Sequence, residues 1–265
     1  MKNISNQAVI HKNAVIGENV TISPFAIIEE NVKIGDNTFI GPYVHISGWT
    51  DIGKNNKILT GAAIGGEPQD FHYKGDKSYV FIGDNNIIHE FVTIHRGTEK
   101  DTKTVIGNNN MFMAYSHAGH NVIVHNNVIL VNSVSLGGYV EVFDKSFVSA
   151  ASQIHQFCKI GRLVMVAPLS KVAKDVPPFM LVQGAETALV KSLNIVGLRR
   201  DENISTDDFE KIKKFYTILY RSNLNTKQAL EKIKLEKELV ENIHIREMIE
   251  FISNASRGIC GHFKK

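Results

Sequence analysis

Residues 4–64 read ISNQAV-IHKNAV-IGENVT-ISPFAI-IEENVK-IGDNTF-IGPYVH-ISGWTD-IGKNNK-ILTGAA-I, with isoleucine at every sixth position from Ile4 to Ile64. A period of six matches neither the 3.6 residues of a helical turn nor the alternation of a simple strand. The same register continues along the chain with mostly aliphatic residues at Ile82, Ile88, Ile94, Ile106, Phe112, Ala118, Val124, Leu130, Leu136, Val142, Val148, Ile154, Ile160, Val166 and Val172. This repeat therefore governs the first two thirds of the sequence.

Each hexad combines one short strand with one sharp turn. Glycine often follows the aliphatic residue, and pairs such as Asp36-Asn37 and Asn108-Asn109 come next. Asn, Asp and Gly tolerate the left-handed backbone conformation that a tight corner requires. Three hexads would close a triangular coil of 18 residues with the aliphatic side chains stacked inside, as in hexapeptide-repeat parallel β-helices. Known coils with this repeat are left-handed, so we expect a left-handed parallel β-helix.

The 265 residues are 43% hydrophobic, enough to fill the narrow interior of such a coil. Residues 1–190 contain 15 Lys/Arg and 16 Asp/Glu, whereas residues 191–265 contain 15 and 11. The C-terminal part is therefore basic, which is typical of either an acidic partner or an ordinary solvated helical surface. We expect a cytoplasmic protein without signal peptide or membrane span, because the repeat begins at Ile4 and both cysteines, Cys158 and Cys260, lack a disulfide pattern.

Two breaks in the ladder predict loops. Residues 65–81 put Asp70 and Asp76 at ladder positions, and residues 97–104 put Lys100 there. Burying an unpaired charge in a dry core costs several kcal/mol, so both segments are expected to loop out of the coil. Loops on a rigid scaffold often carry binding groups.

A helical domain is predicted after the coil. We place the β-helix in residues 1–187, with the repeat stopping after Val172, and the helical domain in residues 188–265. In the second part the spacing of apolar residues predicts helices over 205–219, with Ser205 as N-cap, over 226–239 and over 246–252. Such a small domain should pack on the coil or in an oligomer.

Histidines offer the clearest catalytic signal. His117 and His120 flank the ladder residue Ala118, so both can face outward, and a neutral imidazole suits general base catalysis. One coil of 18 residues places Gly138 over His120, where a bare backbone N–H could bind an oxyanion. Alternatively, Gly137 and Gly138 are only corner residues of the coil and have no role in binding an oxyanion.

A zinc site is the competing reading of these histidines. His120 and His125, with His89, resemble the zinc ligands of left-handed β-helical carbonic anhydrases, although the spacing of His89 differs. Neither cysteine has the surroundings of a nucleophile, and no phosphate-binding or nucleic-acid motif is present. We therefore expect no metal.

Six short segments of the chain are typical of one known family: PQD at 68–70, TIHRGT at 93–98, HAGH at 117–120, IHQFC at 154–158, DVPP at 175–178 and LNIVGLRR at 193–200. Through these segments the sequence closely resembles the UDP-N-acetylglucosamine O-acyltransferases of the lipid A pathway. The resemblance implies a homotrimer with active sites in clefts between neighbouring coils. It also implies transfer of an R-3-hydroxyacyl group from acyl carrier protein to the sugar 3-hydroxyl without any metal, cofactor or covalent intermediate.

The resemblance also implies roles for individual residues. His120 would be the general base and the Gly138 N–H the oxyanion donor. The basic tail would meet the acidic carrier protein. Substrate would be held by Gln69, Asp70, His72, His95, His117, Tyr139, His155, Gln156, Asn194 and Arg200. Met165 and Pro168 would limit acyl length, and Pro168, where relatives often have glycine, predicts a shorter chain.

Four positions depart from the family pattern. His72 replaces a usual lysine, Asn121 a usual aspartate beside the catalytic histidine, and Tyr139 a usual histidine. Asp201 stands where a second basic residue is expected. These changes leave open transfer to a 3-amino sugar, which would give an amide.

Other functions fit the sequence less well. The related N-acyltransferase usually carries a further domain before its repeats, and acetyl-CoA-dependent hexapeptide transferases lack the HAGH and IHQFC segments together. A catalytically silent scaffold would not need the cluster of Asp70, His95, His117 and His120.

Overall fold

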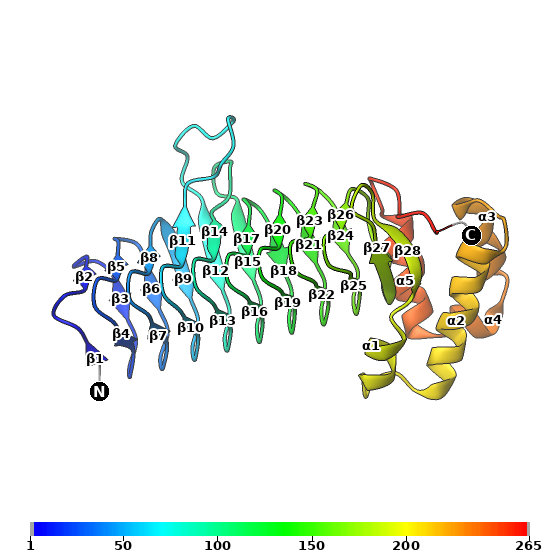
Figure 1. Ribbon diagram of the computed structural model, residues 1–265, viewed down its shortest axis with the longest axis horizontal. Helices are drawn as coiled ribbons and strands as arrows, with labels where there is room; N and C mark the ends of the chain where they lie inside the picture. Colours follow the sequence, from blue (N-terminus) through cyan, green and yellow to red (C-terminus); the bar gives the residue numbers. More distant parts are fainter. Residues whose placement is uncertain (1–2, 264–265) are drawn as a thin grey trace.

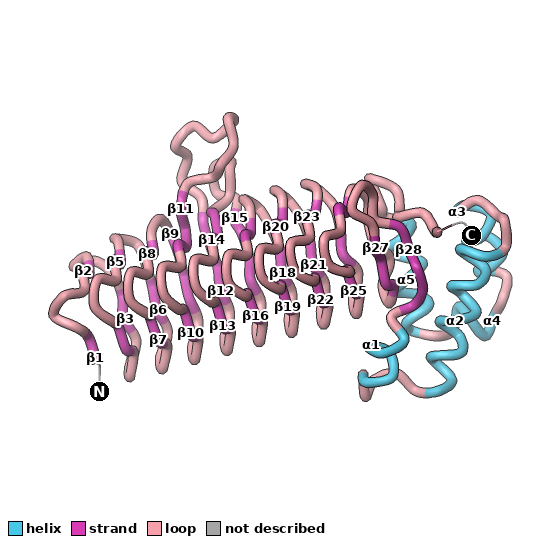
Figure 2. The backbone as a smooth tube through the Cα atoms, viewed as in Figure 1, coloured by secondary structure: helices cyan, strands magenta, loops and turns pink. Residues whose placement is uncertain are grey.

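The computed structural model describes residues 3–263, which form a left-handed parallel β-helix followed by a small helical domain (Figure 1). The coil is long and straight, and all helices lie at its C-terminal end (Figure 2). The fold class predicted from the six-residue period is confirmed.

Three sheets form the sides of the coil. The first contains, in spatial order, β1 (Asn3–Ile4), β4 (Thr21–Ile22), β7 (Phe39–Ile40), β10 (Lys57–Ile58), β13 (Ile87–Ile88), β16 (Met111–Phe112), β19 (Ile129–Leu130), β22 (Phe147–Val148), β25 (Met165–Val166), β27 (Met180–Gln183) and β28 (Leu189–Leu193). The second contains β2 (Val9–Ile10), β5 (Ile27–Ile28), β8 (His45–Ile46), β11 (Ala63–Gly66), β14 (Thr93–His95), β17 (His117–Ala118), β20 (Ser135–Leu136), β23 (Gln153–Ile154) and β26 (Lys171–Val172). The third contains β3 (Val15–Ile16), β6 (Lys33–Ile34), β9 (Trp49–Ile52), β12 (Tyr79–Ile82), β15 (Lys103–Ile106), β18 (Ile123–Val124), β21 (Glu141–Val142) and β24 (Lys159–Ile160).

The ladder residues stack on one another inside the coil. Ile22 pairs with Ile40, and Ile40 with Ile58, each 18 residues further along the chain. These side chains are almost completely buried, and each contributes about 1.5–3 kcal/mol of hydrophobic stabilisation. The two inserted loops increase the number of residues between paired ladder positions, but they do not change the register. Ile58 still pairs with Ile88, and Ile88 with Phe112.

The corners of the coil lie in the left-handed backbone region. Asn19, Asn37 and Asn55 have φ values of 55°, 58° and 56°, as the corner chemistry predicts. Larger residues also adopt this conformation, including Phe25 at 63° and Tyr43 at 58°. Their rings stack at 5.1 Å between centroids, so packing along the corner compensates for the backbone strain.

A column of asparagines is buried where the pattern favours small or β-branched residues. The Asn86 N–H donates to Asn56 Oδ1 and the Asn110 N–H donates to Asn86 Oδ1, both at 2.9 Å. The Val128 N–H continues the column by donating to Asn110 Oδ1. Because each amide satisfies the next, these polar groups are accommodated in the core.

Both interruptions of the ladder are loops. The first joins β11 to β12 and projects far from the coil, and the second joins β14 to β15 beside it (Figure 1). Asp70, Asp76 and Lys100 all lie in these loops outside the core, as the cost of burying their charges predicts. Strand β12 (Tyr79–Ile82) already begins within the stretch predicted as the first insertion, residues 65–81.

The coil does not end at Val172. Strand β27 pairs in parallel with β25, with Val182 beside Val166, and β28 then returns antiparallel to β27. The double proline Pro177-Pro178 therefore lies within the last turn of the coil and not at a domain boundary.

Among the described residues, five helices follow: α1 (Ile195–Arg200), α2 (Thr206–Arg221), α3 (Thr226–Lys234), α4 (Lys237–Val240) and α5 (Ile243–Ser253). Ser205 caps α2, as predicted, and forms a full capping box with Asp208. The helix expected over 226–239 is broken at Leu235 and Glu236, and α1 was not predicted. No helix within residues 3–263 is long and apolar enough to cross a membrane.

The helical domain packs against the end of the coil, as expected. Phe251 of α5 lies edge-on to Phe143 of the coil, with 5.9 Å between ring centroids. The chain after α5 returns to the coil, where Ile259 forms a bridge with Asp175.

Candidate active site

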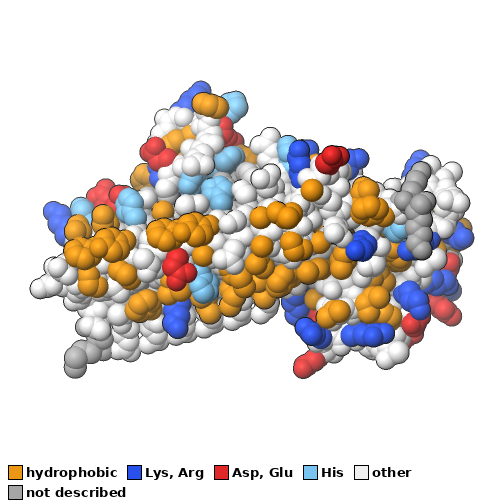
Figure 3. All heavy atoms as spheres, in the orientation of Figure 1, with side chains coloured by type: hydrophobic (Ala, Val, Ile, Leu, Met, Phe, Trp, Pro, Cys, Tyr) orange, Lys and Arg blue, Asp and Glu red, His pale blue; other side chains and the backbone are white. Residues whose placement is uncertain are grey.

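Two cavities meet at His120. The first, which we call the catalytic cavity, has a volume of about 520 Å³ and is lined by Gln69, His95, His117, Gly119, His120, Ser135, Leu136, Gly137, Gly138, Gln153, Ile154, His155, Gln156 and Lys171. The second, the loop cavity, has a volume of about 640 Å³ and is lined by Gln69, Asp70, Phe71, His72, Glu99, His120, Tyr139, Gln156 and Phe157. Histidine side chains are visible at the base of the projecting loop (Figure 3).

His120 lies after strand β17 and is held by its neighbour Asn121. The Thr98 N–H donates to Asn121 Oδ1 at 3.0 Å, which identifies this atom as the amide oxygen. His120 Nδ1 is also 3.0 Å from Asn121 Oδ1 and must therefore be the donor. The proton of the neutral imidazole is thus on Nδ1, and Nε2 presents a free lone pair to the cavities.

Gly138 lies one coil above His120, as the 18-residue spacing predicts. The Tyr139 N–H donates to the His120 carbonyl oxygen at 3.0 Å, which joins the two corners. A Cβ at Gly138 would lie 2.5 Å from His120 Nε2, so only glycine fits beside this ring. The Gly138 N–H donates to no acceptor within residues 3–263 and remains available to a ligand.

Asp70 reaches this corner from the first loop. Its Oδ2 lies 3.5 Å from His120 Nε2, and its Oδ1 accepts hydrogen bonds from the backbone N–H and Nδ1 of His72, both at 2.9 Å. These bonds, the backbone one foremost, lower the pKa of the Asp70 carboxyl below its usual value. A carboxylate therefore faces the basic nitrogen of His120.

His95 and His117 form the floor of the catalytic cavity on neighbouring strands. Their rings are edge-to-face with 5.1 Å between centroids, and His117 Nδ1 lies 2.7 Å from Thr93 Oγ1. Burial lowers the pKa of His95 to about 4 and also lowers that of His117. Both rings are neutral donors or acceptors near pH 7, while His95 Nδ1 has no partner among the described residues.

Tyr139 connects the oxyanion corner to the second loop. Its hydroxyl donates to the Glu99 carboxylate at 2.6 Å, and its ring lies edge-on to His120 and stacks on Phe157. Burial, with the Glu99 contact, raises the pKa of Tyr139 well above its usual value. Thr98 and Glu99 were not predicted as site residues, although Thr98 ends the TIHRGT segment and Glu99 directly follows it.

The remaining predicted residues divide into two groups. His155 and Gln156 line the catalytic cavity together with Gln69. Asn194 and Arg200 lie elsewhere: Arg200 borders a separate cavity of about 350 Å³, and Asn194 caps α1 by accepting from the Gly197 N–H. Met165 and Pro168 line neither of the cavities at His120, since they belong to β25 and the corner after it.

The zinc arrangement of His89, His120 and His125 does not form. His125 Nε2 lies 2.9 Å from Glu141 Oε1, and His89 Nδ1 lies 3.4 Å from Glu90. Within residues 3–263 no three His, Cys, Asp or Glu side chains are arranged to hold a metal ion.

Two family descriptions match the chain. Residues 175–260 match "Udp N-acetylglucosamine O-acyltransferase; Domain 2", and residues 31–66 match "Bacterial transferase hexapeptide (six repeats)". The acyl-[acyl-carrier-protein]–UDP-N-acetylglucosamine O-acyltransferase of Aliarcobacter butzleri is 44% identical over 260 residues, covering 98% of both chains. The enzyme of that name from Pseudomonas entomophila is 41% identical, covering 98% of this chain and 99% of its own.

Solved structures agree with these relatives. The UDP-N-acetylglucosamine acyltransferase of Francisella novicida superposes with a TM-score of 0.93 at 39% identity, covering 97% of this chain and 94% of its own. That of Bacteroides fragilis superposes with a TM-score of 0.91 at 42% identity, covering 96% and 98%.

Proposed function

The chain belongs to the UDP-N-acetylglucosamine O-acyltransferase family, and we propose on that premise that it transfers an R-3-hydroxyacyl chain from acyl carrier protein to the 3-hydroxyl of UDP-N-acetylglucosamine, the first step of lipid A biosynthesis. The observation that carries the mechanism is the pairing of His120 Nε2, a free base, with the unbonded N–H of Gly138 on the next coil. A base beside an oxyanion donor is the arrangement that direct acyl transfer requires.

The reaction proceeds in two stages. His120 Nε2 takes the proton of the sugar 3-hydroxyl as its oxygen attacks the thioester carbonyl, and the Gly138 N–H donates to the oxyanion that forms. The C–S bond then breaks, and the imidazolium returns the proton to the thiolate. The Asp70 carboxylate, 3.5 Å from Nε2, stabilises the transient imidazolium in place of the aspartate that Asn121 replaces.

The acceptor sugar would lie where the two cavities meet. Gln69, Asp70, His95 and His117 offer donors and acceptors around His120. His72 would supply positive charge to a diphosphate, and Tyr139 would close the loop cavity beside it. His155 and Gln156 line the catalytic cavity on the next coil, where the nucleotide or the phosphopantetheine arm would pass.

A homotrimer would complete the site. Asn194 and Arg200 lie outside both cavities of their own chain, so their predicted role in holding the nucleotide or the arm requires a neighbouring copy. The same reasoning applies to Met165 and Pro168 at the end of the acyl groove. Exposed aromatic corners such as Phe91 and Tyr115, stacked at 5.3 Å, supply an apolar surface for the contact.

The reaction needs no metal or redox cofactor, because base and oxyanion donor both come from the chain. The phosphopantetheine arm enters only as part of the carrier protein, whose acidic surface would meet the basic C-terminal region. We place the enzyme in the cytoplasm, where its carrier-protein substrate is made.

Acyl transfer from 3-hydroxyacyl carrier proteins to UDP-N-acetylglucosamine tests the proposal with the wild type beside His120→Ala. We expect product with the wild type and a loss of about 10²–10⁴ in the variant. An active variant would move the base to another group, with His117 the first candidate. Product only with a 3-amino UDP-sugar would replace the O-acyl reaction by N-acylation, and product with neither acceptor would overturn the proposed function.

A further inference from the structure

Arg96 is buried at the root of the first loop, with only 8% of its surface exposed. Its guanidinium makes one hydrogen bond to the end of β11 and two to the loop itself. Nη1 donates to the Gly65 carbonyl oxygen at 2.8 Å, and Nη2 donates to the Tyr73 hydroxyl at 2.7 Å and to Glu67 Oε1 at 3.3 Å. One side chain therefore ties the start of the loop to its middle.

The backbone of Arg96 is held in place by the neighbouring strands. It directly follows His95 at the end of β14, and its own N–H donates to the Gly66 carbonyl oxygen at 3.1 Å. Its guanidinium also lies over the Tyr73 ring, 5.4 Å from the centroid. Between the points held by Arg96, the loop carries Gln69 and Asp70 to His120.

The contacts require an arginine. A planar guanidinium presents several N–H donors in fixed directions, whereas a lysine ammonium is a single point charge on a flexible stem. Arg96 Nε has no partner among the described residues, so the Nη contacts to the loop are what hold this buried cation. Tyr73 and Glu67 are themselves loop residues, so the contacts of the guanidinium with them fix the position of the loop.

We propose that Arg96 is a positioning residue for acyl transfer, which sets Gln69 and Asp70 against His120 by clamping the loop through Tyr73 and Glu67. The inference rests on the proposed function, because it assigns Arg96 an effect on the acceptor side of that reaction. Misplacement of a substrate-holding group by about 1 Å can cost about a hundredfold in rate.

Steady-state kinetics of Arg96→Lys and Tyr73→Phe test this role. We expect kcat/KM for the sugar nucleotide to fall about tenfold to a hundredfold in Arg96→Lys and less in Tyr73→Phe, while KM for the acyl carrier protein stays unchanged. Tyr79→Phe is the matched control, because it removes a hydroxyl near the loop that does not contact Arg96. A KM for the acyl carrier protein that rises as much as the KM for the sugar nucleotide would overturn the proposal.

A double-mutant cycle tests whether Arg96 acts through Asp70. In an Asp70→Asn background, Arg96→Lys should lose much less than in the wild type, because residues that act through one group are not additive. Additive losses would show that Arg96 acts independently of Asp70 and would contradict the inference.

The only tryptophan provides a readout that does not depend on turnover. Trp49 lines a cavity with Arg96 and Glu67, and Lys77 from the end of the loop lies 5.3 Å from its ring centroid. Acrylamide quenching of Trp49 should increase in Arg96→Lys and stay unchanged in Tyr79→Phe at equal thermal stability. Unchanged quenching in Arg96→Lys would refute the role of Arg96 in holding the loop, whether or not the wild type is active. An inactive wild type with increased quenching in Arg96→Lys would count against the proposed function alone.

Discussion

His120 Nδ1 lies 3.0 Å from the side-chain oxygen of Asn121, and this neutral partner fixes the tautomer of the base without adding charge. A carboxylate at this position, introduced by Asn121→Asp, should stabilise the imidazolium form of His120. Because the base must be unprotonated, the acid limb of the kcat/KM profile should move to higher pH, with a higher plateau.

The measurement is the pH profile of acyl transfer for wild type and Asn121→Asp. Asn109→Asp, at an exposed corner of the coil, is the control for a change in charge alone. An unchanged acid limb would show that the contact between His120 and Asn121 does not control the base.

Gly138→Ala should abolish most activity without unfolding the protein. The new methyl group would lie 2.5 Å from His120 Nε2 and Cε1, so the ring must move from the position that faces the oxyanion donor. We expect kcat to fall by about 10² or more with little change in thermal stability. Gly261→Ala, whose methyl group would only touch Leu189 at 3.7 Å, should be silent. A Gly138→Ala enzyme with normal kcat would exclude this corner as the oxyanion site.

The sequence predicts the coil well and the site only in part. Every ladder position requires an apolar side chain that faces the interior of the coil. The period of this pattern alone predicts that His120 stacks under Gly138. The bond between Tyr139 and Glu99 joins residues 40 positions apart and depends on the path of an inserted loop, which no periodicity specifies. The sequence pattern also does not predict the column of Asn56, Asn86 and Asn110, because each amide is tolerated in the core only through hydrogen bonds with its neighbours.

His95 should make stability depend on pH between about 4 and 6.5. Burial lowers its folded-state pKa to about 4, below the 6.5 of the unfolded chain, so the unfolded state binds more protons in this window. Stability is therefore full above about pH 6.5 and decreases as the pH falls toward 4. Urea unfolding should show a steeper decrease for wild type than for His95→Asn.

His125 supplies a control of opposite sign for that experiment. The hydrogen bond to Glu141 raises the pKa of His125 above its usual value, so its contribution is full below about pH 6.5 and is lost as the pH rises through the folded pKa. His125→Asn should therefore lose more stability at low pH than at high pH. If the stability of the two variants changed in the same way with pH, at least one of the two assignments would be wrong.

Pro168→Gly should lengthen the acyl chain that the enzyme accepts. The proline ring would fill the end of the groove completed by a neighbouring copy, and an overpacked site costs about 1–3 kcal/mol. Rates with C10, C12 and C14 carrier proteins should shift toward longer chains in the variant. Equal rates with C10 and C14 in the wild type would remove this role for Pro168.

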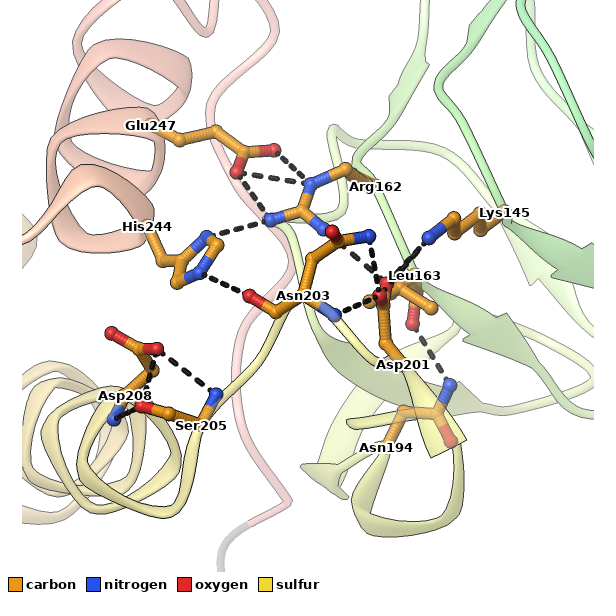
Figure 4. A network of polar contacts seen from close by, with 10 residues as sticks. All are labelled: Lys145, Arg162, Leu163, Asn194, Asp201, Asn203, Ser205, Asp208, His244 and Glu247. Atoms are coloured by element: carbon orange, nitrogen blue, oxygen red, sulfur yellow. Dashed lines mark hydrogen bonds and ion pairs between the residues drawn. The ribbon is translucent and has the colours of Figure 1, made fainter. Parts of the chain in front are cut away.

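Asp201 holds the helical domain to the coil through a buried charge network (Figure 4). Its side chain is 1% exposed, and Lys145 Nζ donates to it at 3.0 Å, with Arg162 at 3.7 Å. Burial alone would raise the pKa of Asp201, but the Asn203 N–H and Lys145 outweigh burial and lower it. Arg162 in turn binds Glu247 of α5 at 2.9 Å, so the network spans both domains.

Asp201→Ala should therefore destabilise the fold by about 1–3 kcal/mol, because Lys145 and Arg162 each lose a carboxylate partner while Glu247 still pairs with Arg162. Asp201→Arg, which restores the basic residue usual in the family, should be at least as damaging, since it places a third cation among Lys145 and Arg162. The exposed Asp207, paired with Lys211, is the control, and its loss should cost at most about 1 kcal/mol. Equal melting temperatures for the Asp201 and Asp207 variants would mean that the network does not hold the two domains together.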